Sequence, residues 1–233
     1  MDTPTPDQPP SEDADPGYRE AVVDLLGVLA YGELNGFLRM AADADAAPTL
    51  RDKAALGRLA ATEFQHYELI LARLGGLGAD PEVAMAPFIP AIDGFHARTR
   101  PSDWLEGLVK AYVGDGIATD FYREVAAYLD ESTAQLVRTV LDEGGQAEFA
   151  VQAVRAAIER DARVAGRLAL WGRRLVGEAI SQAQRVAVER DALSSLLVGG
   201  IGHGGADLAE LGRMFARLTD AHTERMERLG LTP

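Results

Sequence analysis

The chain has 233 residues, of which 47% are hydrophobic and 25% charged, and this globular composition excludes a wholly disordered or collagen-like protein. It has no Cys, so disulfides, thiol nucleophiles and thiolate metal sites are excluded, and any metal must be held by carboxylates and imidazoles. With 36 acidic and 23 basic residues, the net charge of -13 argues against a general nucleic-acid coat protein but leaves room for a local basic face.

The N-terminal segment, residues 1–16, holds five Pro and five acidic residues with almost nothing apolar. Such a segment buries too little surface to offset its ordering entropy, so we predict a disordered, acidic, Pro-rich tail. No apolar run approaches the roughly 18 residues of a membrane span, and the first residues are acidic where a signal peptide would be basic and then apolar. We therefore expect a cytoplasmic protein without a membrane partner.

From residue 17 onward, apolar residues recur at steps of three and four, which is the spacing of a helix with one buried stripe. No stretch alternates with a period of two, so we predict an all-α protein with a single domain over residues 17–230. The Pro- and Gly-rich residues 75–100 are predicted to be a crossover that joins two antiparallel hairpins of a four-helix bundle. The predicted helices span residues 17–44, 49–75, 101–130, 132–159, 161–192 and 205–229.

Three of the predicted helices begin at capping residues. Thr49 has Asp52 three residues on, and Ser132 has Gln135 three residues on, which is the spacing of a capping box. Ser102 is the predicted N-cap of the third helix.

Each of the first four predicted helices carries one acidic residue on its apolar stripe, 11 to 16 residues from the helix start. Equal depth in a bundle predicts that these carboxylates converge in the interior. His66 lies one helical turn after the acid of the second helix, and Gln146 lies one turn after the acid of the fourth. The converging acids are Glu33, Glu63, Asp115 and Glu143.

Four like charges in a low-dielectric interior repel strongly unless protons or cations neutralise them. A pair of metal ions does so, and oxygen and imidazole donors without sulfur favour iron, manganese or zinc. Alternatively, each helix is slightly rotated from the predicted orientation, so that the acid lies at the protein surface. Asp120 and Glu148, each just off a stripe, are alternatives to the acids of the third and fourth helices. Glycines on both sides of Asp115 weaken its helix and indicate close packing or function.

Glu33, the sequence Glu63-Phe64-Gln65-His66 and the inward acids of two further helices resemble the ferritin-like di-iron carboxylate pattern, a Glu followed by Glu-x-x-His, stated twice. The resemblance covers roughly residues 18–160. Residues 170–178 and 182–185 resemble segments of bacterial proteins similar to the tRNA-(2-methylthio-isopentenyladenosine) hydroxylase, which use a di-iron centre and dioxygen to hydroxylate the isopentenyl group of a modified adenosine.

The resemblance implies an antiparallel ferritin-like bundle with two additional C-terminal helices. It also implies two Fe ions, or alternatively Mn or a single ion, because the second half of the motif is degenerate. Asp115 stands where Glu is expected, and Gln146 stands where Glu-x-x-His would place the second imidazole. The implied metal ligands are Glu33, Glu63, His66, Asp115, Glu143 and Gln146.

The fifth predicted helix is the basic part of the chain. An Arg-rich helix is usually solvated or paired with the protein's own acids; alternatively these arginines bind tRNA phosphates, as a base-modifying enzyme requires. The arginines concerned are Arg163, Arg167, Arg173, Arg174 and Arg185. A ferredoxin-like reductant is a second expected partner, and an apolar face on the last two helices that includes Leu168 and Leu175 suggests a homodimer.

The remaining histidines and the tyrosines are not among the predicted ligands. His96, His203 and His222 are given no role, because none has a carboxylate-rich stripe beside it. Buried Tyr in a bundle is usually simple packing. Those near the predicted site in sequence are Tyr31, Tyr67, Tyr112 and Tyr122.

Three functions are compatible with these features. The first is an oxygen-dependent di-metal hydroxylase similar to the tRNA-modifying enzymes. The second is a non-catalytic or mono-metal ferritin-like scaffold for protein interaction. The third is iron storage, which is disfavoured because extra helices and asymmetric charge do not suit a closed symmetric cage.

Overall fold

The structure, a computed structural model, describes residues 15–126, 128–141, 146–197 and 208–233, without the side chains of residues 115, 146, 147, 197 and 208–211. No strand occurs in these ranges, so the all-α prediction is confirmed. The elements are α1 (Pro16–Asp45), α2 (Leu50–Gly76), α3 (Pro81–Met85), η1 (Ala86–Phe88), α4 (Ile89–Arg98), α5 (Trp104–Ala126), α6 (Glu131–Val140), α7 (Gln146–Arg160), α8 (Arg163–Glu189), α9 (Asp191–Leu197) and α10 (Leu208–Arg228).

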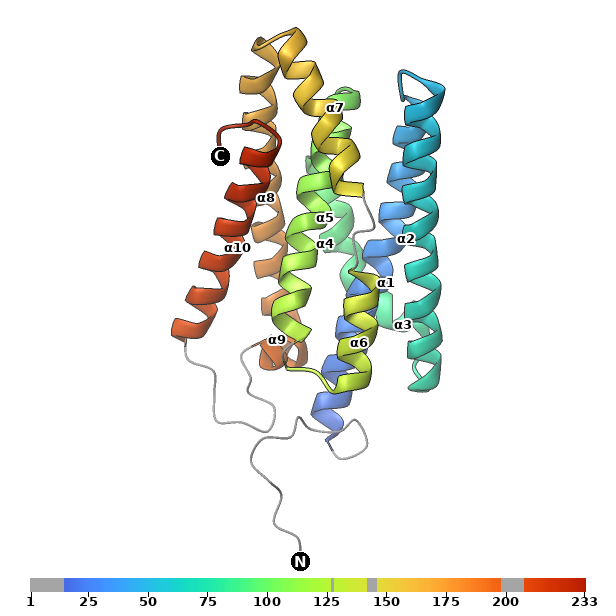
Figure 1. Ribbon diagram of the computed structural model, residues 1–233. Coiled ribbons are helices and arrows are strands. Elements are labelled where there is room, and N and C mark those ends of the chain that lie inside the picture. Colours follow the sequence, from blue (N-terminus) through green and yellow to red (C-terminus); the bar gives the residue numbers. More distant parts are fainter. Residues whose placement is uncertain (1–14, 127, 142–145, 198–207) are drawn as a thin grey trace, which may run out of the picture.

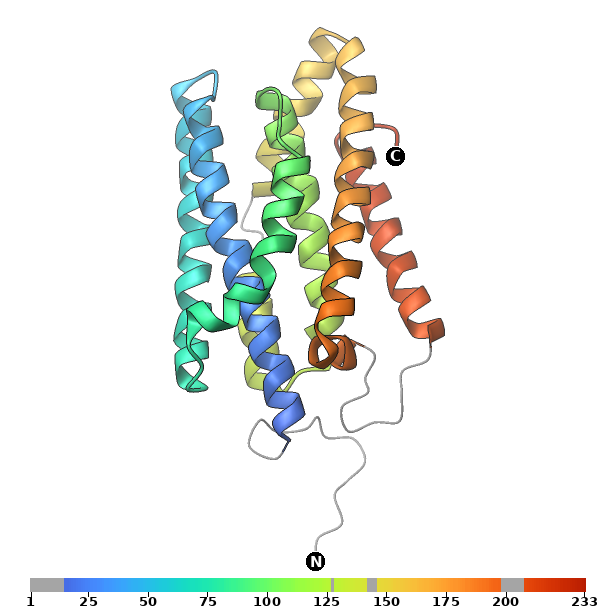
Figure 2. The same ribbon diagram turned by 180° about the vertical axis from the view of Figure 1, so that it is seen from behind.

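The long helices run up and down in one bundle (Figure 1). α1 and α2 form an antiparallel hairpin on one side, while α8 and α10 lie on the other side of α5. α6 and α7 together occupy the place of the single fourth helix that the sequence predicts. Seen from behind, α4 runs between α1 and α8 and contacts both (Figure 2). The expected bundle with additional C-terminal helices is therefore present, and α4 closes one of its faces.

α1 is the central helix of this arrangement. Its side chains Leu25, Leu26 and Leu29 are almost fully buried in a core shared with α2, α3, α6 and α9. By length and composition α1 could cross a membrane, since one 18-residue window has a mean hydropathy of 1.4, but half of that window is buried inside the protein. Such burial is typical of the core helix of a soluble protein. Leu168 and Leu175, predicted for a dimer face, are likewise fully buried in the core.

Residues 75–100 connect the α1–α2 hairpin to α5, as the predicted crossover does, but the segment is helical, because it contains α3, η1 and α4. Its three prolines suggested a non-helical connection. Each of them instead lies in the first turn of a helix, where the missing N–H would be unpaired in any case. Asp80 caps α3 by accepting hydrogen bonds from the backbone N–H groups of Glu82 and Val83.

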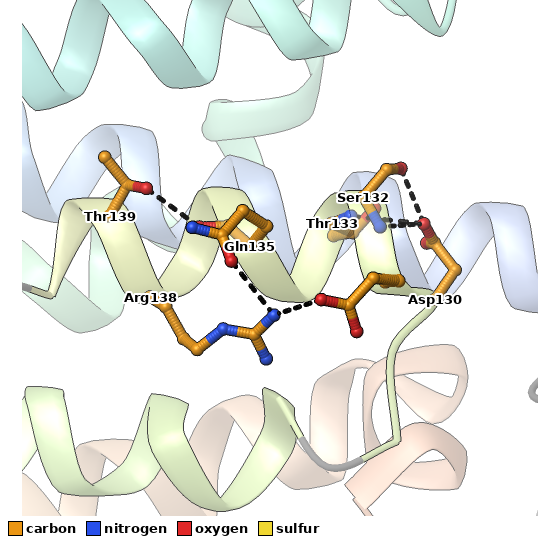
Figure 3. Close-up of polar contacts among 7 residues, drawn as sticks. Asp130, Ser132, Thr133, Gln135, Arg138 and Thr139 are labelled. Atoms are coloured by element: carbon orange, nitrogen blue, oxygen red, sulfur yellow. Dashed lines mark hydrogen bonds and ion pairs between the residues drawn. The ribbon is translucent and has the colours of Figure 1, made fainter.

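The predicted N-cap Thr49 is confirmed, since its hydroxyl oxygen accepts a hydrogen bond from the N–H of Asp52. The two serine caps are wrong. α5 begins after Asp103, whose carboxylate accepts from the N–H of Glu106 at 2.9 Å. α6 begins after Asp130, which accepts from Ser132 and Thr133 (Figure 3).

The same network shows what the rest of the predicted capping box does. Gln135 does not return to the helix start but accepts a hydrogen bond from Arg138, which also pairs with Glu131 at 2.6 Å (Figure 3). The stronger acceptor, a carboxylate, thus takes the cap position at the N-terminal end of the helix dipole.

Other predicted boundaries need correction. α5 is shorter than the predicted 101–130, and the predicted helix 132–159 is divided, because α6 ends at Val140 and α7 starts at Gln146. α8 ends at Glu189, where Arg190 leaves the helix to form a bidentate ion pair with buried Asp24 of α1. The predicted tail, residues 1–16, overlaps Asp15 and Pro16, which cap and begin α1, and its first 14 residues lie outside the described ranges.

Candidate metal site

Three predicted ligands meet between α1 and α2. One ligand atom from each of Glu33, Glu63 and His66 lies within 4.8 Å of the other two. Nδ1 of His66 is 3.5 Å from Oε2 of Glu33, and these two side chains are only 13% and 12% exposed. The arrangement follows from local geometry, because residues three apart share a helix face and the hairpin places that face against α1.

A glycine of α1 faces one of the ligands. A Cβ atom added to Gly36 would lie 2.9 Å from Oε2 of Glu63, closer than such contacts normally are. Gly36 is therefore the residue that lets the Glu63 carboxylate reach the same space as Glu33, one helical turn earlier on α1. The glycine leaves room for the carboxylate that a larger side chain would displace.

The three side chains line a cavity of about 460 Å³ that is partly open to solvent. α1 and α5 contribute its long walls, α4 covers one side, and the end of α6 closes it at Val140 and Leu141. Most of the other lining side chains are apolar. The cluster thus combines oxygen and imidazole donors with an internal space that can hold a small molecule.

The sequence profile of a family described as ferritin-like domain, actinomycetes, matches residues 16–200, from α1 through α9. The chain belongs to this family. A comparison with the curated proteins finds no match. The family match supports the ferritin-like part of the sequence resemblance and does not extend to the narrower likeness to tRNA-modifying hydroxylases.

The second half of the ferritin-like ligand set lies outside the described part of the chain. Asp115 belongs to α5 and Gln146 is the first residue of α7, but their side chains are not described, and Glu143 is in the undescribed segment 142–145. Their role as ligands stays a prediction.

The two alternative acids make contacts elsewhere. Asp120 accepts hydrogen bonds from Arg225 of α10, one of them 2.6 Å long from Nη1. A Cβ on Gly116 would overlap the Arg225 side chain, so this glycine makes room for the ion pair. Glu148 is exposed and accepts a hydrogen bond from Gln152.

Tyr122 of α5 is the one of the four tyrosines that lines the cavity. Burial and then the charge of the nearby Glu33 carboxylate raise the pKa of Tyr122 well above its usual value. Its hydroxyl therefore stays protonated beside Glu33. Tyr31 instead donates a hydrogen bond to Asp93, Tyr67 packs on Phe64, and Tyr112 lies in the core under Arg228.

Sequence reasoning missed two histidines, one partly buried and one buried. His96 of α4 lines the cavity, and burial together with Lys110 and Arg39 lowers its pKa to about 3. His222 of α10 is 5% exposed, and its pKa is lowered to about 4 by burial and by Arg225. Both are therefore neutral at physiological pH. His96 was assigned to a non-helical connection; its spacing from Ile92, which also lines the cavity, was the available signal.

Proposed function

We propose that this protein is an oxygen-dependent, metal-containing hydroxylase whose metal, most suitably iron, is held by Glu33, Glu63 and His66. The observation that carries the proposal is the position of these three ligands at an apolar internal cavity of a ferritin-like domain. A binding site for a cation next to a space for a small molecule is what such a reaction requires.

The residues present fit a metal ion. Two carboxylates and one imidazole suit Fe or Mn, and also Zn, and their negative charge in a mostly buried position favours a bound cation. Gly36 leaves space for the Glu63 carboxylate beside the other two donors, which together could surround a common ion.

Iron bound to such ligands supplies dioxygen activation. The chain's own contribution is to position the substrate and exclude water, which the apolar walls of α1, α4 and α5 do. Tyr122 keeps its proton on Oη and can donate it in a hydrogen bond toward the Glu33 side of the site. A second ion would use Asp115, Glu143 and Gln146, and we propose that it is held less tightly, because an amide oxygen replaces an imidazole nitrogen.

A mono-metal or non-catalytic scaffold is the second candidate function. The observation in its favour is that Glu33, Glu63 and His66 are the only group of three or more such donors among the described residues. Oxygen consumption with a reductant separates the two functions, because a scaffold would hold the metal without turnover.

The proposal of tRNA as substrate depends on the arginines of α8, and each of them has a partner within the protein. Arg163 pairs with Asp161, and Arg185 pairs with Glu189. Arg167 bonds acids of α5 and of the segment before it, and Arg173 and Arg174 bond backbone carbonyls. Such pairing favours an intramolecular role. We likewise propose that a ferredoxin-like protein supplies electrons, that the protein forms a homodimer and that it is located in the cytoplasm.

Metal analysis of purified variants tests the proposed site. His66→Ala should remove most of the metal, because it deletes the one imidazole of the three-donor cluster and leaves only two protein ligands. Gln146→Ala should cost much less, since its amide is a weak ligand at most. Equal metal loss from the two truncations, measured by elemental analysis after identical purification, would refute this ordering.

A further inference from the structure

The cavity has a second polar region that the proposed metal chemistry does not use. Besides the metal ligands, its lining includes the cations Arg39, Arg100 and Lys110, from α1, the residue stretch after α4, and α5. Asp43 and His96 line the same region. Lys110 and Arg39 both act electrostatically on Asp43 and on His96, which shows that these groups lie near one another.

Two of the three cations have no partner among the described residues. All three line the cavity together with Asp43, and the imidazole of His96 is neutral. Arg39 and Arg100 are exposed, and neither forms a hydrogen bond or ion pair with a described residue. Lys110 donates to the carbonyl of Thr99 at 2.8 Å and lies over the ring of Phe95.

His96 adds a hydrogen-bonding group without a described partner. Its Nδ1 is buried and has no hydrogen-bond partner among the residues that the structure describes. A buried polar atom at the wall of a cavity is costly unless a ligand or water satisfies it. The cations favour an anionic group at this end of the cavity, and His96 can donate a hydrogen bond to it in the tautomer that carries its proton on Nδ1.

Between the two ends the walls are apolar and extend along the helices. Glu33 and Arg39 are six residues apart on α1, and Glu33 and Asp43 are ten apart, which corresponds to about 9 and about 15 Å of helix rise. Met40, Ile92 and Phe95 are among the apolar side chains of the lining, and Val28 and Leu29 extend it beyond Glu33, on the side away from Arg39. A chain of that length would extend from the cations to the metal ligands.

We propose that the cavity binds an amphiphilic anion, with its carboxylate or phosphate at Arg39, Arg100 and Lys110 and its apolar chain directed toward Glu33, Glu63 and His66. Binding stands on the cavity alone, and the further step that this molecule is the substrate rests on the proposed hydroxylase function. The anionic end fixes the ligand, and the far end of the chain is the part that reaches the metal ligands.

Isothermal titration calorimetry of the full-length protein with decanoate, decyl phosphate and decanol tests the proposal. Decanoate should bind at least about tenfold more tightly than decanol, because hydrogen bonds to charged groups have that effect or more. The ratio of decanoate to decyl phosphate affinity shows which head group the site prefers. Equal affinity for decanoate and decanol, or no binding of any of the three, would overturn the proposal.

The double variant Arg39→Gln/Arg100→Gln isolates the cations and breaks no described contact. It should lower decanoate affinity at least about tenfold and leave decanol affinity unchanged. The matched control Arg58→Gln, an exposed arginine of α2 away from the cavity, should bind like the wild type. Unchanged decanoate affinity in the double variant would contradict the assignment.

Two further variants separate this site from the metal site. Gly114→Leu should weaken binding of all three ligands, since Gly114 lines the cavity and no atom lies within 4 Å of where its Cβ would be. His66→Ala should lose metal but keep decanoate affinity within about twofold. If the wild-type protein binds decanoate but takes up no metal, the proposed function is wrong and the proposed anion site is supported. If it takes up metal but does not bind decanoate, the proposed anion site is wrong and the metal site is supported.

Discussion

Replacing His222 with Phe should reduce the loss of stability that the protein suffers in mild acid. The ring of His222 is buried in α10, and neither of its nitrogens has a hydrogen-bond partner among the described residues. Burial, and then the charge of Arg225, lower its pKa from 6.5 to about 4. Because the folded-state pKa lies below the unfolded one, the unfolded chain takes up the proton first. The stabilisation by neutral His222 is therefore complete above pH 6.5 and is lost as the pH falls toward 4.

The size of the effect follows from the same values. At pH 5 the solution is about 1.5 units below the unfolded pKa, and at about 1.36 kcal/mol per unit the free energy of unfolding drops by about 2 kcal/mol relative to pH 7.5. His96, with its pKa lowered to about 3, adds a similar loss. These two histidines should thus contribute a loss of about 4 kcal/mol between these pH values, and the loss in His222→Phe should be smaller than that in the wild type by about 2 kcal/mol.

Urea unfolding followed by circular dichroism at both pH values measures this difference directly. At pH 7.5 the variant should be as stable as the wild type or more so, because Phe removes two unpaired ring nitrogens without removing a described hydrogen bond. A loss of stability between pH 7.5 and 5 that is the same in both proteins would refute the account of His222 as a buried neutral group.

Two other substitutions test the packing around the site. Arg225→Met should lower the free energy of unfolding by up to about 3 kcal/mol in urea, because it leaves the partly buried Asp120 with only its longer ion pair to Arg123, and adding Asp120→Asn should restore most of the loss. Gly36→Ala should lower metal affinity at least about tenfold in a competition titration, because its Cβ would displace the carboxylate that it faces. The control is Gly57→Ala, at an exposed α2 position where an added Cβ would meet open space. Like Gly36→Ala, it should stabilise its helix by up to about 1 kcal/mol, but it should keep the metal. Equal metal affinity in the two variants would be contrary to the proposed role of Gly36.

The parts of the fold that local physics decides were predictable from the sequence. The bounds of α1 and α2 agree with the predicted ones within one residue, because a long apolar stripe and the Thr49 cap define them. Where distant residues decide, prediction failed. α8 ends where Arg190 pairs with Asp24, a partner 166 positions away that no local pattern indicates. The helices α3 and α4 were missed because proline was taken as a breaker, although it is favourable in a first turn.

The candidate site likewise has one part that could be predicted from the sequence and one that could not. Glu33, Glu63 and His66 could be brought together by reasoning, because two periodic helices joined by a short turn must pack antiparallel. The basic end of the cavity could not, since Arg39, Arg100 and Lys110 come from three separate segments, one of them next to the unpredicted α4. Their convergence is a tertiary property that follows from how α4 is placed between α1 and α8 (Figure 2).

We expect a metal ion to be held between α1 and α2. Anomalous diffraction at the iron absorption edge would locate such an ion. Crystals grown from protein loaded anaerobically with Fe(II) should show an anomalous peak within bonding distance of Glu33, Glu63 and His66. Crystals of His66→Ala prepared in the same way should show a much weaker peak at that position or none. A wild-type map without a peak among these three side chains would contradict the account, even if iron were bound elsewhere in the protein.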